Sequence, residues 1–193
     1  MKKKFVLTCL IAISSITLSA CSFNIGSSDH SMMDGKDLLS LASSEYDATA
    51  LMFASMMVPH HEQALVMADM ALEKSNTPEL LQLAAEIKAA QAPEIAQMQT
   101  WLETVPGYEP GHMGHDAMQG MLSASQIEGM RSLTGIAFDK AFLLGMIAHH
   151  EGALVMARMI SSSENEEVKA LGEAIITSQT AEIDLMKTMI SKF

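Results

Sequence analysis

A fourteen-residue segment occurs twice in this chain. Residues 57–70 and residues 146–159 lie 89 positions apart and agree at ten of their fourteen positions. The shared positions include the polar triplet His-His-Glu within an otherwise apolar segment. A purely hydrophobic core would not need that triplet. The repetition therefore predicts two similar structural units, each with a pair of histidines at the equivalent point.

Each copy has the spacing of an amphipathic helix. At about 100° per residue, an apolar stripe is centred on Met57 and Ala64, and His60 and His61 project on either side of its centre. We expect both imidazoles to point inward. Adjacent residues on a helix do not face each other, so one pair needs side chains from a second helix to form a metal site.

A second match supplies that helix. The pattern Gln-x-x-Glu-Ile-x-x-Met occurs at residues 91–98 and again at residues 179–186. A helical projection places Gln91, Glu94 and Met98 on the apolar face. A carboxylate there is costly unless it is paired or bound to a metal. Each repeat therefore predicts a helical hairpin with two histidines on one arm and Gln, Glu and Met on the other.

Two such hairpins predict an all-α fold, an antiparallel four-helix bundle made of two repeated helical hairpins. We expect Thr77 to cap the second long helix, and Ser125 and Glu128 to open a short helix with capping-box spacing. Pro59 and Pro93 should each bend a helix or mark a new start. The helical-bundle domain is assigned to residues 37–193, with repeat one at 45–103, a linker at 104–122 and repeat two at 135–191. The long helices are expected from between 37 and 47 to about 74, from about 78 to 103, from about 135 to 160, and from about 165 to 191.

The start of the chain has the features of a bacterial lipoprotein signal peptide. Residues 1–20 contain three lysines followed by a short apolar run, which is too short for a comfortable membrane span. The run ends in a sequence that resembles a lipobox, so Cys21 is expected to be lipidated and to anchor the exported protein to a membrane. Residues 21–36 form a predicted flexible tether. If the envelope has two membranes, Ser22 fits sorting to the periplasmic face of the outer one.

Composition narrows the chemistry of the exported protein. Loss of the signal removes Cys9 and three lysines, so no free thiol would remain and the net charge would fall from −11 to −14. A surface of this charge is expected to repel nucleic acid and to attract cations. The chain also has 18 methionines, whose thioethers either fill cores or bind soft metals such as copper(I). Methionine and histidine ligands suit soft-metal chemistry in an oxidising exterior.

The linker between the repeats holds further histidines and methionines. Within ten residues it contains His112, Met113, His115, Met118 and Met121. These side chains could capture a soft metal, or they could belong to a turn-rich connection that is methionine-rich only by composition. The sequence leaves these two interpretations open.

The ordered motifs resemble a known family. They are the segments 57–64, 91–98, 120–123, 135–143 and 146–153. Together they are similar to the secreted double-histidine domain family, formerly of unknown function, which includes CopM-like copper metallochaperones. The resemblance covers roughly residues 45 to 190. It implies a ferritin-like helical bundle outside the cytoplasm, with copper binding by His and Met in at least some members. The chain departs from the family pattern at Ala148, where a proline is usual, and has Ala50 where the second repeat has Asp139.

Carried onto this sequence, the resemblance gives a set of metal-ligand candidates. They are His60, His61, His149 and His150, with Met57 and Met146 one helical turn before them. The inward Glu94 and Glu182 are expected to orient histidines from a second shell or to bind the oxidised ion directly. Glu62 and Glu151 should be solvated, and Met67, Met70, Met156 and Met159 should fill the core.

We compare three functions for these patterns and favour the first. The first is a lipid-anchored copper-binding protein that buffers, sequesters or transfers copper, with a copper-handling protein as a possible partner. The second is an envelope interaction module in which His and Glu form a buried polar layer without metal. The third is a di-iron carboxylate oxidase, which needs Glu-x-x-His on two helices. Neither repeat contains that spacing, so we expect no enzymatic activity.

Overall fold

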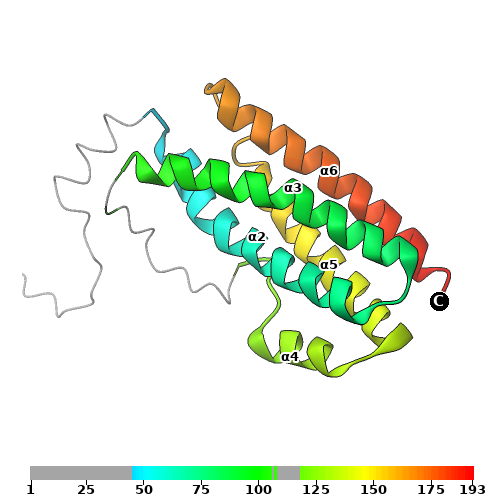
Figure 1. Ribbon diagram of the computed structural model, residues 1–193. Coiled ribbons are helices and arrows are strands. Elements are labelled where there is room, and N and C mark those ends of the chain that lie inside the picture. Colours follow the sequence, from blue (N-terminus) through cyan, green and yellow to red (C-terminus); the bar gives the residue numbers. More distant parts are fainter. Residues whose placement is uncertain (1–44, 106, 108–117) are drawn as a thin grey trace, which may run out of the picture. The chain divides into compact units, whose positions relative to one another are not determined.

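The computed structural model describes residues 45–105, 107 and 118–193. This part of the chain is helical and contains no β-strand (Figure 1). Its helices are α2 (Ala48–Lys74), α3 (Pro78–Glu103), α4 (Ala124–Ser132), α5 (Gly135–Ala157) and α6 (Glu166–Ile190). The four long helices form two hairpins, α2–α3 and α5–α6, so the predicted antiparallel four-helix bundle is confirmed. No helix in the described ranges is both long and apolar enough to cross a membrane.

Helices α2 and α6 begin at side chains that cap free backbone N–H groups. The Asp47 carboxylate accepts a hydrogen bond from the N–H of Ala50, and Asn165 caps α6 in the same way. Thr77 precedes α3 as predicted, but its hydroxyl does not cap that helix. It donates instead to the buried carboxylate of Asp139 at 2.6 Å, which ties the start of α3 to α5.

The short helix α4 starts earlier than predicted. Its capping box joins Ser123 and Gln126, so the prediction from Ser125 and Glu128 is wrong. The physical reason lies just before the helix, where the backbone of Leu122 is held by hydrogen bonds to the side chain of Gln63. These contacts fix the end of the linker at Leu122, and Ser123 is the first residue free to cap.

Neither proline starts a new helix. Helix α2 runs as one element through Pro59, and α3 runs as one element through Pro93. A proline removes one backbone hydrogen bond from a helix interior. Both helices bury an apolar stripe along their length, and this packing outweighs the local loss.

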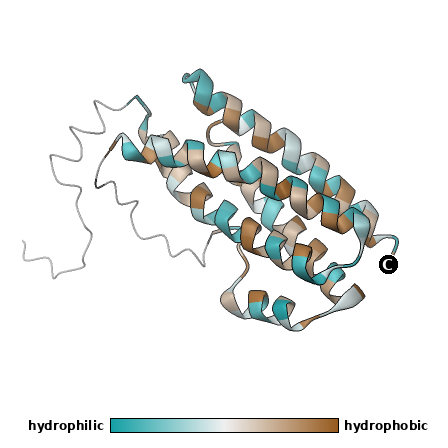
Figure 2. Cartoon of the chain, in the orientation of Figure 1, coloured by the Kyte–Doolittle hydropathy of each residue, from teal (hydrophilic) through white to brown (hydrophobic). Residues whose placement is uncertain are grey.

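The two inner helices are α2 and α5, which pack on each other, while α3 packs on α2 and α6 packs on α5. Hydrophilic residues are spread along the outward faces of the bundle (Figure 2). Glu62 and Glu151 are exposed, as expected. Met67, Met70 and Met156 are buried as predicted, but Met159 is 37% exposed because α5 ends at Ala157, two residues before it.

The hydrophobic core is divided into two clusters. One cluster surrounds Phe138, Phe142 and Met67, and the other surrounds Phe53 and Trp101. Along each long helix, a stretch of residues that belongs to neither cluster separates them: residues 59–63 in α2, 88–97 in α3, 148–152 in α5 and 177–182 in α6. These stretches contain the repeated His-His and Gln-x-x-Glu motifs. The bundle therefore carries a polar layer across its middle.

Candidate metal centre

The two repeats meet at a pair of histidines. The rings of His60 in α2 and His149 in α5 have centroids 3.8 Å apart and an interplanar angle of 37°. The two residues are 0% and 1% exposed, and the neighbouring His61 and His150 are both 0% exposed. All four predicted histidines therefore lie inside the bundle, at the junction of its two inner helices.

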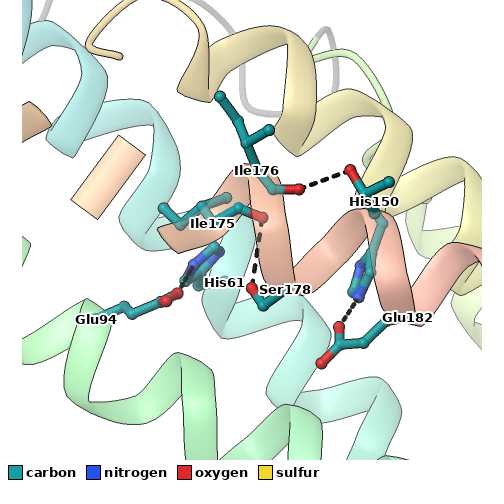
Figure 3. Close-up of polar contacts among 8 residues, drawn as sticks. His61, Glu94, His150, Ile175, Ile176, Ser178 and Glu182 are labelled. Carbon is teal, nitrogen blue, oxygen red and sulfur yellow. Dashed lines mark hydrogen bonds and ion pairs between the residues drawn. The ribbon is translucent and has the colours of Figure 1, made fainter. Parts of the chain in front are cut away.

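Each outer helix supplies a glutamate to one histidine. Nε2 of His61 lies 2.7 Å from a carboxylate oxygen of Glu94, and Nε2 of His150 lies 2.5 Å from the equivalent oxygen of Glu182 (Figure 3). An ionised carboxylate can only accept, so each imidazole donates through Nε2–H. In the neutral imidazole Nδ1 then keeps a lone pair, and carboxylates commonly fix metal-binding histidines in this way.

His60 has a backbone partner in place of a glutamate. Its Nε2 lies 3.3 Å from the carbonyl oxygen of Gln119, at the end of the linker. A carbonyl oxygen also only accepts, so His60 has the same tautomer as His61 and His150. The sequence did not predict a role for Gln119, because every residue has a main-chain oxygen and the residue type does not show which one is used. The nearby segment 120–123, which belongs to the family pattern, was the only available signal.

Several polar atoms in this layer have no hydrogen-bond partner. Nδ1 of all four histidines is buried and unpartnered, as is Nε2 of His149. The side-chain oxygens of Gln91 and Gln179, at equivalent places in the two repeats, are also unpartnered. An unsatisfied buried polar atom costs about 1–3 kcal/mol, and the total stability of a domain is only about 5–15 kcal/mol. Such a set of atoms calls for a bound ion or ordered water.

Burial keeps two of the histidines neutral. Desolvation, followed by the nearby His61, lowers the pKa of His60 to about 3. Desolvation, followed by the neighbouring His60, lowers the pKa of His149 well below its ordinary value of 6.5. Neutral imidazoles are the form that binds metals, so both rings have lone pairs available at neutral pH.

This arrangement belongs to a recognisable family. Residues 50–190 match the profile described as a domain of unknown function, DUF305. The chain belongs to the DUF305 family. The family resemblance inferred from the repeated motifs is thereby confirmed. None of the curated proteins matches the chain.

Solved structures with the same fold include other DUF305 proteins and CopM. A DUF305 fragment from Deinococcus radiodurans is 30% identical, with a TM-score of 0.68 over 76% of this chain and 97% of that one. A DUF305 protein from Streptomyces coelicolor, named as a candidate secreted protein, is 26% identical, with a TM-score of 0.69 over 75% of this chain and 91% of that one. CopM in its Cu(I)-bound form is 33% identical, with a TM-score of 0.62 over 74% of this chain and 96% of that one.

The thioether candidates of this DUF305 domain flank the polar layer. Met57 and Met146 are both 0% exposed, one turn before their histidines. Met98 and Met186, four residues after the two glutamates, are also fully buried. Met118 and Met121 are half-buried near the end of the linker. The remaining candidates, His112, Met113, His115 and the lipidation site Cys21, lie outside the described residues.

The layer is not a cage of histidines and carboxylates. Among the residues that the structure describes, no three His, Cys, Asp or Glu side chains gather into a group that could hold a metal ion. The imidazoles come together in pairs instead, with thioethers near them in the helices. This donor set suits a soft ion that accepts few ligands, such as copper(I), better than an ion that requires several oxygen ligands.

One edge of the layer reaches the surface. A groove of about 420 Å³ between α3 and α6 is lined by Glu94 and Glu167, with Ala90, Ala170 and Ala174 among its small residues. Glu94 is 16% exposed at its side chain and holds the fully buried His61. The carboxylate that orients His61 therefore also lines this groove.

Glu-x-x-His is absent from both helical repeats, but it occurs once in the linker, at Glu109 and His112. That segment lies outside the described residues. A di-iron bundle needs this spacing on two helices, so a single linker copy does not supply such a site.

Proposed function

We propose that this DUF305 protein binds copper outside the cytoplasm and buffers, sequesters or transfers it. One observation carries the proposal. Three histidines donate through Nε2, to Glu94, Glu182 and the Gln119 carbonyl, and each leaves a buried Nδ1 without a partner. Histidines held in this way are oriented to bind a metal through Nδ1, because no group of the protein pairs with that atom.

The choice of copper rests on the donors and on the relatives. Imidazole and thioether ligands suit copper(I), and in each hairpin the buried histidine pair follows a buried methionine by one helical turn. His60, His61, His149 and His150 would supply nitrogen ligands, and Met57 and Met146 would supply sulfur. Glu94 and Glu182 would act through their histidines. CopM, which shares the fold, is known in Cu(I)-bound, Cu(II)-bound and silver-bound forms.

The metal titration is the direct test. Metal-free protein is titrated with copper(I) in the presence of a competing chelator and compared with a variant in which all four repeat histidines are alanine. X-ray absorption of the loaded protein should show nitrogen and sulfur neighbours around copper. Equal affinity of the two proteins would overturn the proposal, provided that circular dichroism shows both to be helical. If the fourfold variant is unfolded, His149→Ala alone takes its place.

Export and anchoring form a separate part of the proposal. The lysine-led apolar segment 1–20, followed by Cys21, supports secretion and lipidation, and one relative is named as a candidate secreted protein. Metabolic labelling with a fatty-acid analogue should mark the wild-type protein in the membrane fraction. Cys21→Ser should abolish the label and release the protein. Label that persists in this variant would contradict anchoring at Cys21.

A structural role is the second candidate. The His61–Glu94 and His150–Glu182 hydrogen bonds could fix how the helices dock without any metal. The two functions differ in one measurement. A purely structural layer predicts that copper leaves the melting temperature unchanged, whereas a binding site predicts a rise that grows with the concentration of free copper.

A further inference from the structure

A short backbone segment covers the histidine pair. The side-chain amide of Gln63 donates to the carbonyl oxygen of Leu122 at 2.8 Å, and the N–H of Leu122 donates to Gln63 Oε1 at 2.7 Å. Both hydrogen-bonding groups of the Gln63 side chain are used on one residue. This clasp holds the end of the linker, residues 119–122, against α2 directly beside His60.

The same segment touches α5 through backbone atoms. A Cβ atom added at Gly152 would lie 1.9 Å from the carbonyl oxygen of Gln119. Gly120 has a φ of +88°, and a Cβ atom there would lie 2.6 Å from the carbonyl oxygen of Ala148. Neither approach leaves room for a side chain. Glycine is unfavourable inside a helix relative to alanine, so Gly152 is explained by this contact and not by the helix.

Gln63 and Gly152 occupy the same position in the two repeats, immediately after His-His-Glu. In the first repeat, the Gln63 side chain holds residues 119–122 by hydrogen bonds. In the second repeat, the absence of a side chain at Gly152 lets the backbone of the same residues approach α5. The Gln119 carbonyl is thereby placed at Nε2 of His60. His61 and His150 have glutamate partners, so only His60 depends on this segment for its tautomer.

We propose that Gln63 and Gly152 are positioning residues for His60: they hold the Gln119 carbonyl so that His60 donates through Nε2 and directs an unprotonated Nδ1 into the polar layer. The effect on copper affinity rests on the proposed function. The tautomer itself does not, because it is a property of the metal-free protein.

Nitrogen NMR of the imidazoles tests the proposal on metal-free, full-length protein. Signals are assigned by single histidine substitutions, and the variants are Gln63→Ala and Gly152→Ala. In the wild type, His60, His61 and His150 should all carry the proton on Nε2. In both variants His60 should become a mixture of tautomers, whereas His61 and His150 should not change. Their unchanged signals separate loss of positioning from general unfolding.

The matched control is Gln82→Ala. Gln82 is an exposed glutamine of α3 whose side chain donates only to Glu86 on the same helix. This variant should leave all four histidine signals unchanged. A wild-type His60 protonated on Nδ1, or a His60 that keeps Nε2–H in both test variants, would overturn the proposal. If Gly152→Ala does not fold, Gln63→Ala decides the outcome alone.

Copper(I) affinity gives a second readout. Loss of a partner that orients a metal-binding histidine typically lowers affinity about 10- to 100-fold, so we expect at least a tenfold fall in Gln63→Ala and none in Gln82→Ala. Unchanged tautomers in a protein that binds copper would refute the positioning role alone. A tautomer shift in a protein that does not bind copper would refute the proposed function alone.

Discussion

The rings of His60 and His149 lie 3.8 Å apart between their centroids, although 89 positions separate the two residues in the chain. Each is the first histidine of its repeat. The two repeats therefore contact each other through equivalent side chains, and both hairpins contribute to one polar layer. A metal bound there would join the halves of the bundle.

Substitution of these two histidines should be non-additive. His60→Ala and His149→Ala should each lower copper(I) affinity by about 100-fold or more, because either one removes half of a shared pair. The double variant should bind little more weakly than either single variant. Chelator competition measures all three affinities. If the losses of binding free energy in the two single variants add up in the double variant, the two histidines serve separate sites.

The glutamates should act through their histidines. Glu94→Gln and Glu182→Gln keep a hydrogen-bond acceptor but lose its charge, so each should lower copper affinity about tenfold, at the lower end of the range for such partners. The two effects should be similar, since the His–Glu distances are 2.7 and 2.5 Å. Isothermal titration calorimetry with a competing chelator gives both values.

The neighbouring exposed acids provide the matched control for these substitutions. Glu62→Gln and Glu151→Gln make the same change next to His61 and His150, on the solvent side of the same helices. They should leave affinity unchanged. If all four variants weaken copper binding equally, the cause is the negative charge of the protein and not the orientation of the imidazoles.

Methionine substitutions should separate ligands from core filler. Met57→Leu and Met146→Leu conserve volume, so each should cost less than about 1.5 kcal/mol of stability. Copper(I) affinity should nevertheless fall, by about tenfold for loss of one thioether ligand. Met70→Leu, in the buried core but not adjacent to the histidines in sequence, should have no such effect. If all three variants bind copper(I) as tightly as the wild type, nitrogen ligands alone bind the metal.

The hydrogen bonds of Glu167 should make stability depend on acid pH. Its carboxylate accepts from Gln97 at 2.9 Å, Trp101 at 3.0 Å and Tyr46 at 3.1 Å, and these bonds lower the pKa of Glu167 below its ordinary value of 4.5. A pKa that is lower in the folded state means that the ionised form stabilises the fold. This contribution is fully present above about pH 4.5 and is lost as the pH falls through the folded value.

Glu167→Gln should therefore be less stable than the wild type at pH 7, by about 1 kcal/mol or less because the carboxylate is exposed and screened. The difference should shrink at pH 3. Chemical unfolding followed by the fluorescence of Trp101, the chain's single tryptophan, measures it at both pH values. A difference that stays constant with pH would show that the charge of Glu167 plays no part.

Much of the bundle could be predicted because its signals are periodic. The two copies of His-His-Glu and of Gln-x-x-Glu repeat at helical spacing, and this alone placed His60 and Glu94 inside. The glutamates were expected to orient histidines, but the neighbours of His60 were harder to predict. That His60 faces His149 follows from how two hairpins dock, and helical periodicity within one hairpin contains no information on docking.

The remaining errors have local physical causes. Ser125 has the right spacing for a capping box, but the clasp of Gln63 on Leu122 fixes an earlier start for α4. Met159 continues the apolar repeat, but the helix ends two residues before it. In both cases a tertiary contact or a chain turn outside the repeated pattern determined the outcome.

The difference between Gln63 and Gly152 sets a limit on redesign by duplication. A protein built from two copies of the first hairpin would keep four imidazoles and two glutamates, yet it would have glutamine where Gln119 now lies against bare backbone. Two copies of the second hairpin would lack the amide that grips Leu122. The difference at this position therefore gives the two hairpins separate tasks, and neither half can substitute for the other.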